Sequence, residues 1–213
     1  MSSADFLLSP EVQKLLQVVF SKPREQFSTD ALAKTTRLSV ADVAKTLEHL
    51  TKSGILTLHG APSDGAETVS VDTSFVFYAE LRRIALKSFA AAEPIRKMLR
   101  TKFKTSVMRA FILGEDDASN VELLVVHGAL VPDQADMAAA CKRLSASLGR
   151  HLKVHVISHS GYASLTPRDA LGAKLAAGCT FEILGEGDTK AKAPTQRQGL
   201  LQSARRRLAS FAR

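Results

Sequence analysis

The sequence has few cysteines. Cys141 and Cys179 are the only two, and neither has another Cys or a His nearby at the spacing of metal ligands. Both lie in segments that we expect to be helical or to end a helix. We therefore predict buried free thiols at both positions and no metal site.

Long apolar runs are also missing. No stretch approaches the roughly 20 apolar residues that cross a bilayer. The N-terminus MSSADFLLSPEVQ lacks the basic and then apolar order of a secretory signal. We therefore expect a cytoplasmic protein without a membrane partner. Hydrophobic residues make up 45% of the 213 residues and charged residues 23%, which is ordinary for a folded protein with room for two modest domains.

Positive charge exceeds negative charge, with a formal net charge of +8. Residues 188–213 hold seven Lys and Arg against one acid, so most of the excess lies in this basic C-terminal tail. Such a charge suits a polyanionic partner, although many basic tails are merely solvated. From residue 198 the apolar side chains fall on one helical stripe. We expect this helix to dock on protein, and phosphate contacts are the alternative.

The first 74 residues contain three helix signals. Ser9, followed by a proline and an acid, begins an amphipathic helix that Pro23 ends. Ser28 caps a short second helix, TDALAKTTR, with Ala31 and Leu32 facing inward. Ser39 caps a third helix, which Gly54 ends. Two β-type runs follow at 55–59 and 68–71, separated by the turn-rich GAPSDGAE. Three helices and then a β-hairpin predict a winged helix-turn-helix over residues 1–74.

The third helix has two distinct faces. One face is predicted to pack into the core through Val40, Val43, Ala44, Leu47 and Leu50. An opposite, free face fits the major groove of B-DNA, while a wing contacts phosphates or the minor groove. The predicted DNA contacts are Ser28, Thr36, Arg37, Ser39, Ala41, Lys45, His49, Lys52 and His59. Asp42 and Glu48 on the same face leave a protein-interaction module as an alternative.

Residues 75–104 predict one linking helix or two, with the break at Pro94, and such a helix commonly serves dimerisation. Residues 105–187 then alternate strand and helix patterns, with a helix near 134–148 and another capped by Thr166-Pro167. This alternation predicts an α/β domain with a small mixed sheet. The whole chain is therefore expected to be α+β, with residues 188–213 as the basic tail.

The segment VMRAFILGEDDASNVELLVVHG resembles the opening of the polymerase-β-type minimal nucleotidyltransferase fold. Gly114 matches the glycine of the family's Gly-Ser, and Glu115 stands in place of the serine. Asn120 and Glu122 stand where the family has Asp-x-Asp. The stretch LGRHLKVHVIS resembles the strand that often carries a third carboxylate, and it offers His155 instead.

These differences bear on chemistry. The resemblance implies magnesium held by carboxylates, bridging a triphosphate. With those positions altered, we expect no catalysis and no cofactor or metal. His151, His155 and His159, spaced by four along a β-run, are not expected to form a metal site either. We expect the domain to serve assembly or ligand sensing instead. A small molecule or a nucleotide is a possible effector.

A winged helix followed by this strand pair resembles one group of prokaryotic transcriptional regulators, over roughly residues 10–187. The sequence thus predicts a regulator of transcription that binds double-stranded DNA as a homodimer. One alternative is a divergent nucleotidyltransferase or an antitoxin-like nucleotide-binding protein. A second alternative is a protein-interaction scaffold.

Overall fold

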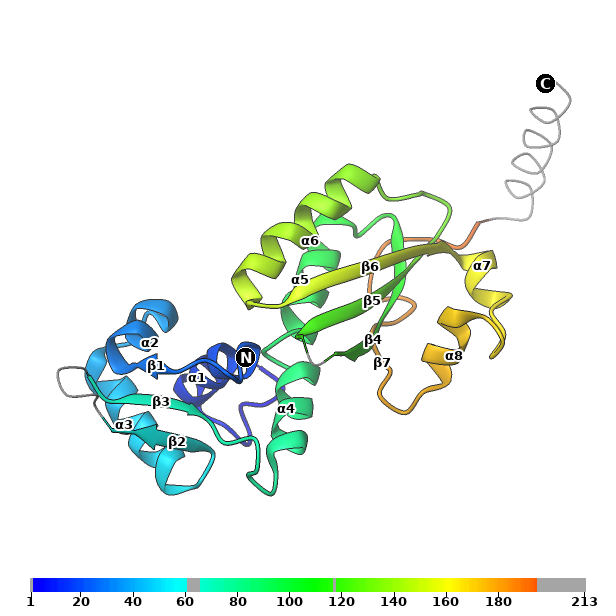
Figure 1. The fold of residues 1–213 in the computed structure, drawn as a ribbon. Helices are drawn as coiled ribbons and strands as arrows, with labels where there is room; N and C mark the ends of the chain where they lie inside the picture. Colours follow the sequence, from blue (N-terminus) through cyan, green and yellow to red (C-terminus); the bar gives the residue numbers. More distant parts are fainter. Residues whose placement is uncertain (1, 61–65, 117, 195–213) are drawn as a thin grey trace, which may run out of the picture. The chain divides into compact units, whose positions relative to one another are not determined.

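The structure, a computed structural model, describes residues 2–60, 66–116 and 118–194 (Figure 1). The chain divides into two compact units. The first unit comprises residues 1–94 and 144–151, and the second comprises residues 95–143 and 152–213. Helices and strands occur in both units, so the protein is α+β, as the sequence predicts. No helix in the described parts of the chain is both long enough and apolar enough to cross a membrane.

The first unit begins with three helices: α1 (Pro10–Ser21), α2 (Thr29–Thr36) and α3 (Val40–Lys52). Each begins where the sequence predicts, because a serine hydroxyl at the N-cap accepts a backbone N–H of the first turn. The predicted caps at Ser9, Ser28 and Ser39 are confirmed.

Three short strands complete this arrangement: β1 (Phe27–Ser28), β2 (Leu56–His59) and β3 (Thr68–Val71). The sheet order is β1-β3-β2, and β3 pairs antiparallel with both neighbours. The hairpin is confirmed, and most of the predicted connection, residues 61–65, lies outside the described residues. A two-residue strand such as β1 is too short to give a periodic pattern. The order α1-β1-α2-α3-β2-β3 is that of a winged helix.

The core of the first unit gathers apolar side chains from α1, α2, α3 and the sheet. On α3 the buried positions are Val43, Leu47 and Leu50, a narrow stripe at spacings of four and three. Val40 and Ala44 lie at the edges of that stripe and are exposed, so the predicted packing face is too wide. On α2, Leu32 is buried as predicted, whereas Ala31 is exposed and Ala33 reaches the core in its place.

Two separate helices replace the predicted linking helix: α4 (Tyr78–Lys87) and α5 (Ala92–Lys102). The break falls at residues 88–91, so the predicted break at Pro94 is wrong. Pro94 lies instead in the first turn of α5. There its missing N–H removes no helical hydrogen bond.

The second unit contains β4 (Val107–Glu115), β5 (Asn120–His127), β6 (His151–Ser158) and β7 (Phe181–Leu184). The sheet order is β6-β5-β4-β7, with β4 antiparallel to both β5 and β7. Helix α6 (Gln134–Leu148) connects β5 to its neighbour β6 and has the predicted bounds.

Helices cover the sheet. One face carries Phe111, Leu113, Leu124 and Val126, which pack with side chains of α7 (His159–Ala163) and α8 (Ala170–Ala176). The residues of β4 and β5 that point to the opposite face are buried as well, as expected for a sheet that is covered on both faces. Helices α5 and α6 lie along this other face (Figure 1).

Two details of this helical layer differ from prediction. No signal in the sequence predicts α7, and α8 begins at the N-cap Asp169, not at Thr166. The Asp169 carboxylate accepts hydrogen bonds from the Thr166 N–H and hydroxyl, which places Thr166 in the preceding turn.

The two cysteines lie in different surroundings. Cys141 on α6 is buried, and burial raises the pKa of its thiol. Cys179 is exposed, so the prediction of a buried thiol there is wrong. It lies in the turn between α8 and β7, where its sulfur is 3.2 Å from the Leu113 carbonyl oxygen.

Residues 188–192, here called the strap, follow β7 and run against the second unit. The Thr189 hydroxyl donates to the Val107 carbonyl, and the Lys190 N–H donates to the Lys104 carbonyl at 2.8 Å. The Ala129 N–H donates to the Lys192 carbonyl. The beginning of the predicted tail therefore belongs to the fold. The helix predicted from residue 198 lies outside the described residues.

Candidate nucleic-acid interface

Helix α3 has one face that is exposed to solvent and one that is packed into the core. Its buried stripe leaves Ala41, Lys45 and His49 exposed, as the sequence predicts. A helix held in this way, with one free face and an adjacent hairpin, has the dimensions that fit a DNA major groove.

The N-terminus of α3 is stabilised by a reciprocal pair. The Ser39 Oγ accepts the Asp42 N–H at 3.1 Å and donates to Asp42 Oδ2 at 2.6 Å. The predicted DNA contact at Ser39 competes with this geometry, because its hydroxyl proton already has an acceptor. Ser28 uses its oxygen in the same way, accepting the Ala31 N–H, and its own proton has no acceptor among the described residues.

The turn between α2 and α3 separates two residues that the sequence treats alike. Arg37 is exposed and left-handed, with φ 57° and ψ 35°. Thr36 is buried, and its hydroxyl donates to the Leu32 carbonyl at 2.7 Å. The predicted phosphate contact from Thr36 is therefore wrong, since the side chain points into the unit.

The C-terminal part of α3 contains an ion pair between two of its own side chains. Lys52 Nζ lies 2.6 Å from Glu48 Oε1, and both side chains are exposed. The hydrogen bond from Lys52 lowers the pKa of Glu48. On the hairpin, His59 is half-buried, with Nε2 2.8 Å from the Ser70 hydroxyl. Of the predicted cationic contacts, Arg37 and Lys45 are exposed and have no ion pair with any described residue.

Two hollows flank α3. One, of about 310 Å³, lies between α1 and α3, and Lys45 and His49 line it together with Glu11. The other, of about 400 Å³, lies between α3 and the hairpin. Its lining is mainly apolar, with Leu58 and Val69 on the hairpin side and Glu48 on the helix side.

Charge is divided unevenly between the units. Counted over the sequence, the first unit has eleven Lys and Arg and eleven Asp and Glu. The second unit has eighteen against ten, which accounts for the whole net charge of +8. The first unit, which contains the winged helix, therefore has no net charge.

The second candidate site lies at the beginning of β5. Gly114 pairs directly opposite Glu122 across β4 and β5, beside a register shift in β4. From β6, His155 Nε2 lies 2.8 Å from Glu122 Oε1. The structure thus brings together three of the residues that the nucleotidyltransferase resemblance singles out.

Cations surround the Glu122 carboxylate, whose side chain is 17% exposed. Lys174 Nζ on α8 is 2.5 Å from Oε2, and Lys153 Nζ on β6 is 3.5 Å from Oε1. Burial by itself raises the pKa of this carboxyl, but hydrogen bonds from Lys174 and His155 outweigh it and lower the pKa to about 2. Glu122 is therefore ionised at neutral pH, and its charge is balanced within the protein.

Asn120 and Glu115, the other positions that the nucleotidyltransferase resemblance singles out, lie at the turn between β4 and β5. The Asn120 side-chain amide donates to Asp116 Oδ2, and its backbone N–H donates to Oδ1, both at 2.8 Å. Ser119 completes the turn in a left-handed conformation, with φ 58°. Glu115 is the last residue of β4 and pairs opposite Val121. The Asn120 amide group is thus already used to hold the loop.

Sequence reasoning misses the two lysines of this cluster. Lys153 lies two residues before His155 on the same strand, so alternation on a strand is a signal that could have identified it. Lys174 comes from another element, and no local pattern connects it to Glu122. Among the described residues, no group of three or more His, Cys, Asp and Glu side chains is arranged to hold a metal ion.

Known proteins show little similarity to this chain. No protein-family model matches it, and no curated protein matches it. Among solved structures, the chain is similar to a mutant of MepR from a multidrug-resistant S. aureus clinical isolate, with 15% sequence identity and a TM-score of 0.32. The similarity covers 37% of this chain and 57% of the MepR chain. At so low a TM-score it adds nothing to the topology described above.

Proposed function

We propose that this protein is a transcriptional regulator that binds double-stranded DNA through α3. The observation that carries the proposal is the exposed face of α3, with Ala41, Lys45 and His49, held over a buried stripe and beside an antiparallel hairpin. In this arrangement the helix enters the major groove and the hairpin contacts the flanking backbone.

The charges on this face define the kind of binding expected. Lys45 supplies a cation and His49 a ring that donates or accepts hydrogen bonds to base edges. Arg37, at the turn before α3, is positioned for a phosphate. Asp42 and Glu48 offset these cations, so affinity from α3 rests on a few specific contacts and less on bulk attraction.

The proposal is tested by selecting bound fragments of genomic DNA with the purified full chain. The test variant is Lys45→Ala with His49→Ala. The matched control is Lys142→Ala with His151→Ala, which removes one exposed lysine and one exposed histidine elsewhere. The wild type and the control should enrich the same sites, and the test variant should lose that enrichment. Equal recovery by all three proteins would refute the proposal.

We further propose that the second unit does not catalyse nucleotidyl transfer and serves assembly, as a homodimer, or ligand sensing. Two observations support this. The Glu122 carboxylate is already engaged by Lys174 and His155, and the Asn120 amide is engaged by Asp116. A carboxylate balanced by ammonium groups is a poor magnesium ligand, because binding the metal would require breaking those pairs. Turnover of nucleoside triphosphates with magnesium would contradict this proposal.

One observation favours an alternative for the winged helix. The mainly apolar 400 Å³ hollow between α3 and the hairpin, together with the exposed Leu58, suits a protein partner. The genomic selection separates the two functions, because a protein-interaction module enriches no shared DNA site.

A further inference from the structure

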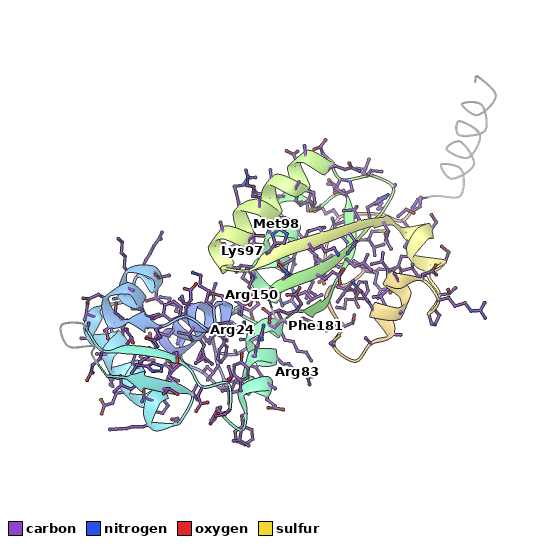
Figure 2. All side chains as sticks on the ribbon, viewed as in Figure 1. Arg24, Arg83, Lys97, Met98, Arg150 and Phe181 are labelled. Atoms are coloured by element: carbon purple, nitrogen blue, oxygen red, sulfur yellow. The ribbon has the colours of Figure 1, made fainter. Side chains whose placement is uncertain are left out.

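A row of cations lies on the second unit. Lys97 and Arg100 lie three residues apart on α5, about 60° from each other around the helix, and Lys104 lies in the turn that follows the helix. All three are exposed, whereas Met98 and Leu99 between them are buried. Figure 2 labels Lys97 and Met98 on this helix.

The strap widens this row. The hydrogen bond from the Lys190 N–H to the Lys104 carbonyl sets these two lysines side by side. Lys192 follows two residues later, held by its carbonyl to Ala129. Lys190 and Lys192 are both exposed. The five residues together, here called the basic row, are Lys97, Arg100, Lys104, Lys190 and Lys192.

The basic row keeps its charge. No member forms an ion pair with any residue that the structure describes. Asp188, the acid nearest to the strap lysines in sequence, accepts the Gly185 N–H. This contrasts with α3, where Glu48 holds Lys52. Five cations without local partners create a positive potential that attracts a polyanion.

We propose that the basic row binds the phosphate backbone of duplex DNA, independently of sequence. The inference rests on the proposed function. It explains how a protein whose first unit has no net charge obtains the general affinity for phosphates on which DNA-binding proteins depend. The linear arrangement favours DNA over a membrane surface, because Lys97 and Arg100 are about 4.5 Å apart along the α5 axis and Lys104 follows in the turn after the helix, so that the cations follow a line of phosphates.

The test measures how salt weakens binding of the full chain to a duplex of arbitrary sequence. The variant Lys97→Ala, Arg100→Ala, Lys104→Ala is compared with Lys14→Ala, Arg83→Ala, Arg168→Ala, which removes the same charge at exposed positions elsewhere. The slope of log affinity against log salt should become shallower by about 3 in the row variant, one unit for each lost phosphate contact. It should stay within about 1 of the wild type in the control. A Gln version of the row variant provides a second preparation if the Ala version folds poorly.

The outcomes separate this inference from the proposed function. A wild-type slope in the row variant, or an equal change in the control, overturns the inference even if genomic selection finds specific sites. Loss of site preference in the Lys45→Ala and His49→Ala variant concerns only the proposed function. Binding to phosphatidylserine vesicles that depends on the basic row, with an unchanged duplex slope, would identify a membrane surface and overturn the inference.

Discussion

Glu122 illustrates how surroundings decide what a carboxylate can do. Its position in β5, opposite Gly114, is one that the resemblance to nucleotidyltransferases associates with a metal ligand. Lys153 on β6 and Lys174 on α8 give it cationic partners instead. A pattern of neighbours in sequence cannot reveal this, because the partners come from elements 31 to 52 residues away.

Replacing Glu122 with Gln should lower the free energy of unfolding at neutral pH by about 1–2 kcal/mol, after allowance for partly exposed lysines. The folded pKa of about 2 lies below the ordinary value of 4.5. The stabilisation is therefore complete above pH 4.5 and is lost as the pH falls toward 2. Urea unfolding measured across this range should show a weaker pH dependence in the variant.

The control for Glu122 is Glu25→Gln. Glu25 pairs with Lys22 on the surface, where both side chains are about half exposed. An exposed pair contributes only about 0–1 kcal/mol. Equal effects of the two substitutions would mean that Glu122 gains nothing from its enclosed position.

Arg37 allows backbone strain and DNA contact to be separated. Its left-handed conformation favours glycine, so Arg37→Gly should leave the free energy of unfolding unchanged or raise it by up to about 1 kcal/mol. The same variant should bind DNA more weakly, because a phosphate contact is removed. Lys34→Gly also removes a cation, but from a helical position, where glycine should cost about 1 kcal/mol. Thermal unfolding and duplex binding of both variants measure the two effects.

At the scale of elements, the caps explain why so much of the fold can be predicted from the sequence. A serine with helix-forming residues after it acts locally, and Ser9, Ser28 and Ser39 all begin helices as expected. The failures fall where the sequence carries no local signal. The interval between α4 and α5 contains no proline, and α7 is a five-residue helix. Neither the break nor so short a helix produces a periodic pattern.

The cap of α3 can be tested directly. Ser39→Ala should lower the free energy of unfolding by about 1 kcal/mol, because the Asp42 N–H loses its acceptor. Ser39→Asn should recover most of that loss, since asparagine is also a good N-cap. Chemical denaturation of the three proteins is sufficient. An unaffected Ala variant would show that α3 needs no cap.

At the scale of the whole molecule, the strap changes the meaning of the predicted tail. Charge alone places its beginning at residue 188, whereas hydrogen bonds at Thr189, Lys190 and Lys192 join the first residues to β4 and to the segments that follow α5 and β5. The candidate sites also differ in how far they can be predicted from the sequence. The exposed face of α3 could be foreseen from one helix, but the basic row and the Glu122 cluster depend on segments far apart in sequence.

Two truncations distinguish the strap from the rest of the tail. Ending the chain after Asp188 should lower the free energy of unfolding by about 1–3 kcal/mol relative to ending it after Pro194, because three hydrogen bonds are lost. Thermal unfolding of both provides the comparison, and identical midpoints would show that the strap contributes nothing to stability.

Counted over the sequence, the whole net charge of +8 belongs to the second unit, and the first unit has none. A polyanion should therefore attract the second unit at long range more strongly than the first. The rate of encounter should then follow ionic strength, whereas the lifetime of a complex should follow contacts that are made later. A protein built in this way can change what it recognises, by substitutions on its neutral unit, without changing how quickly it arrives.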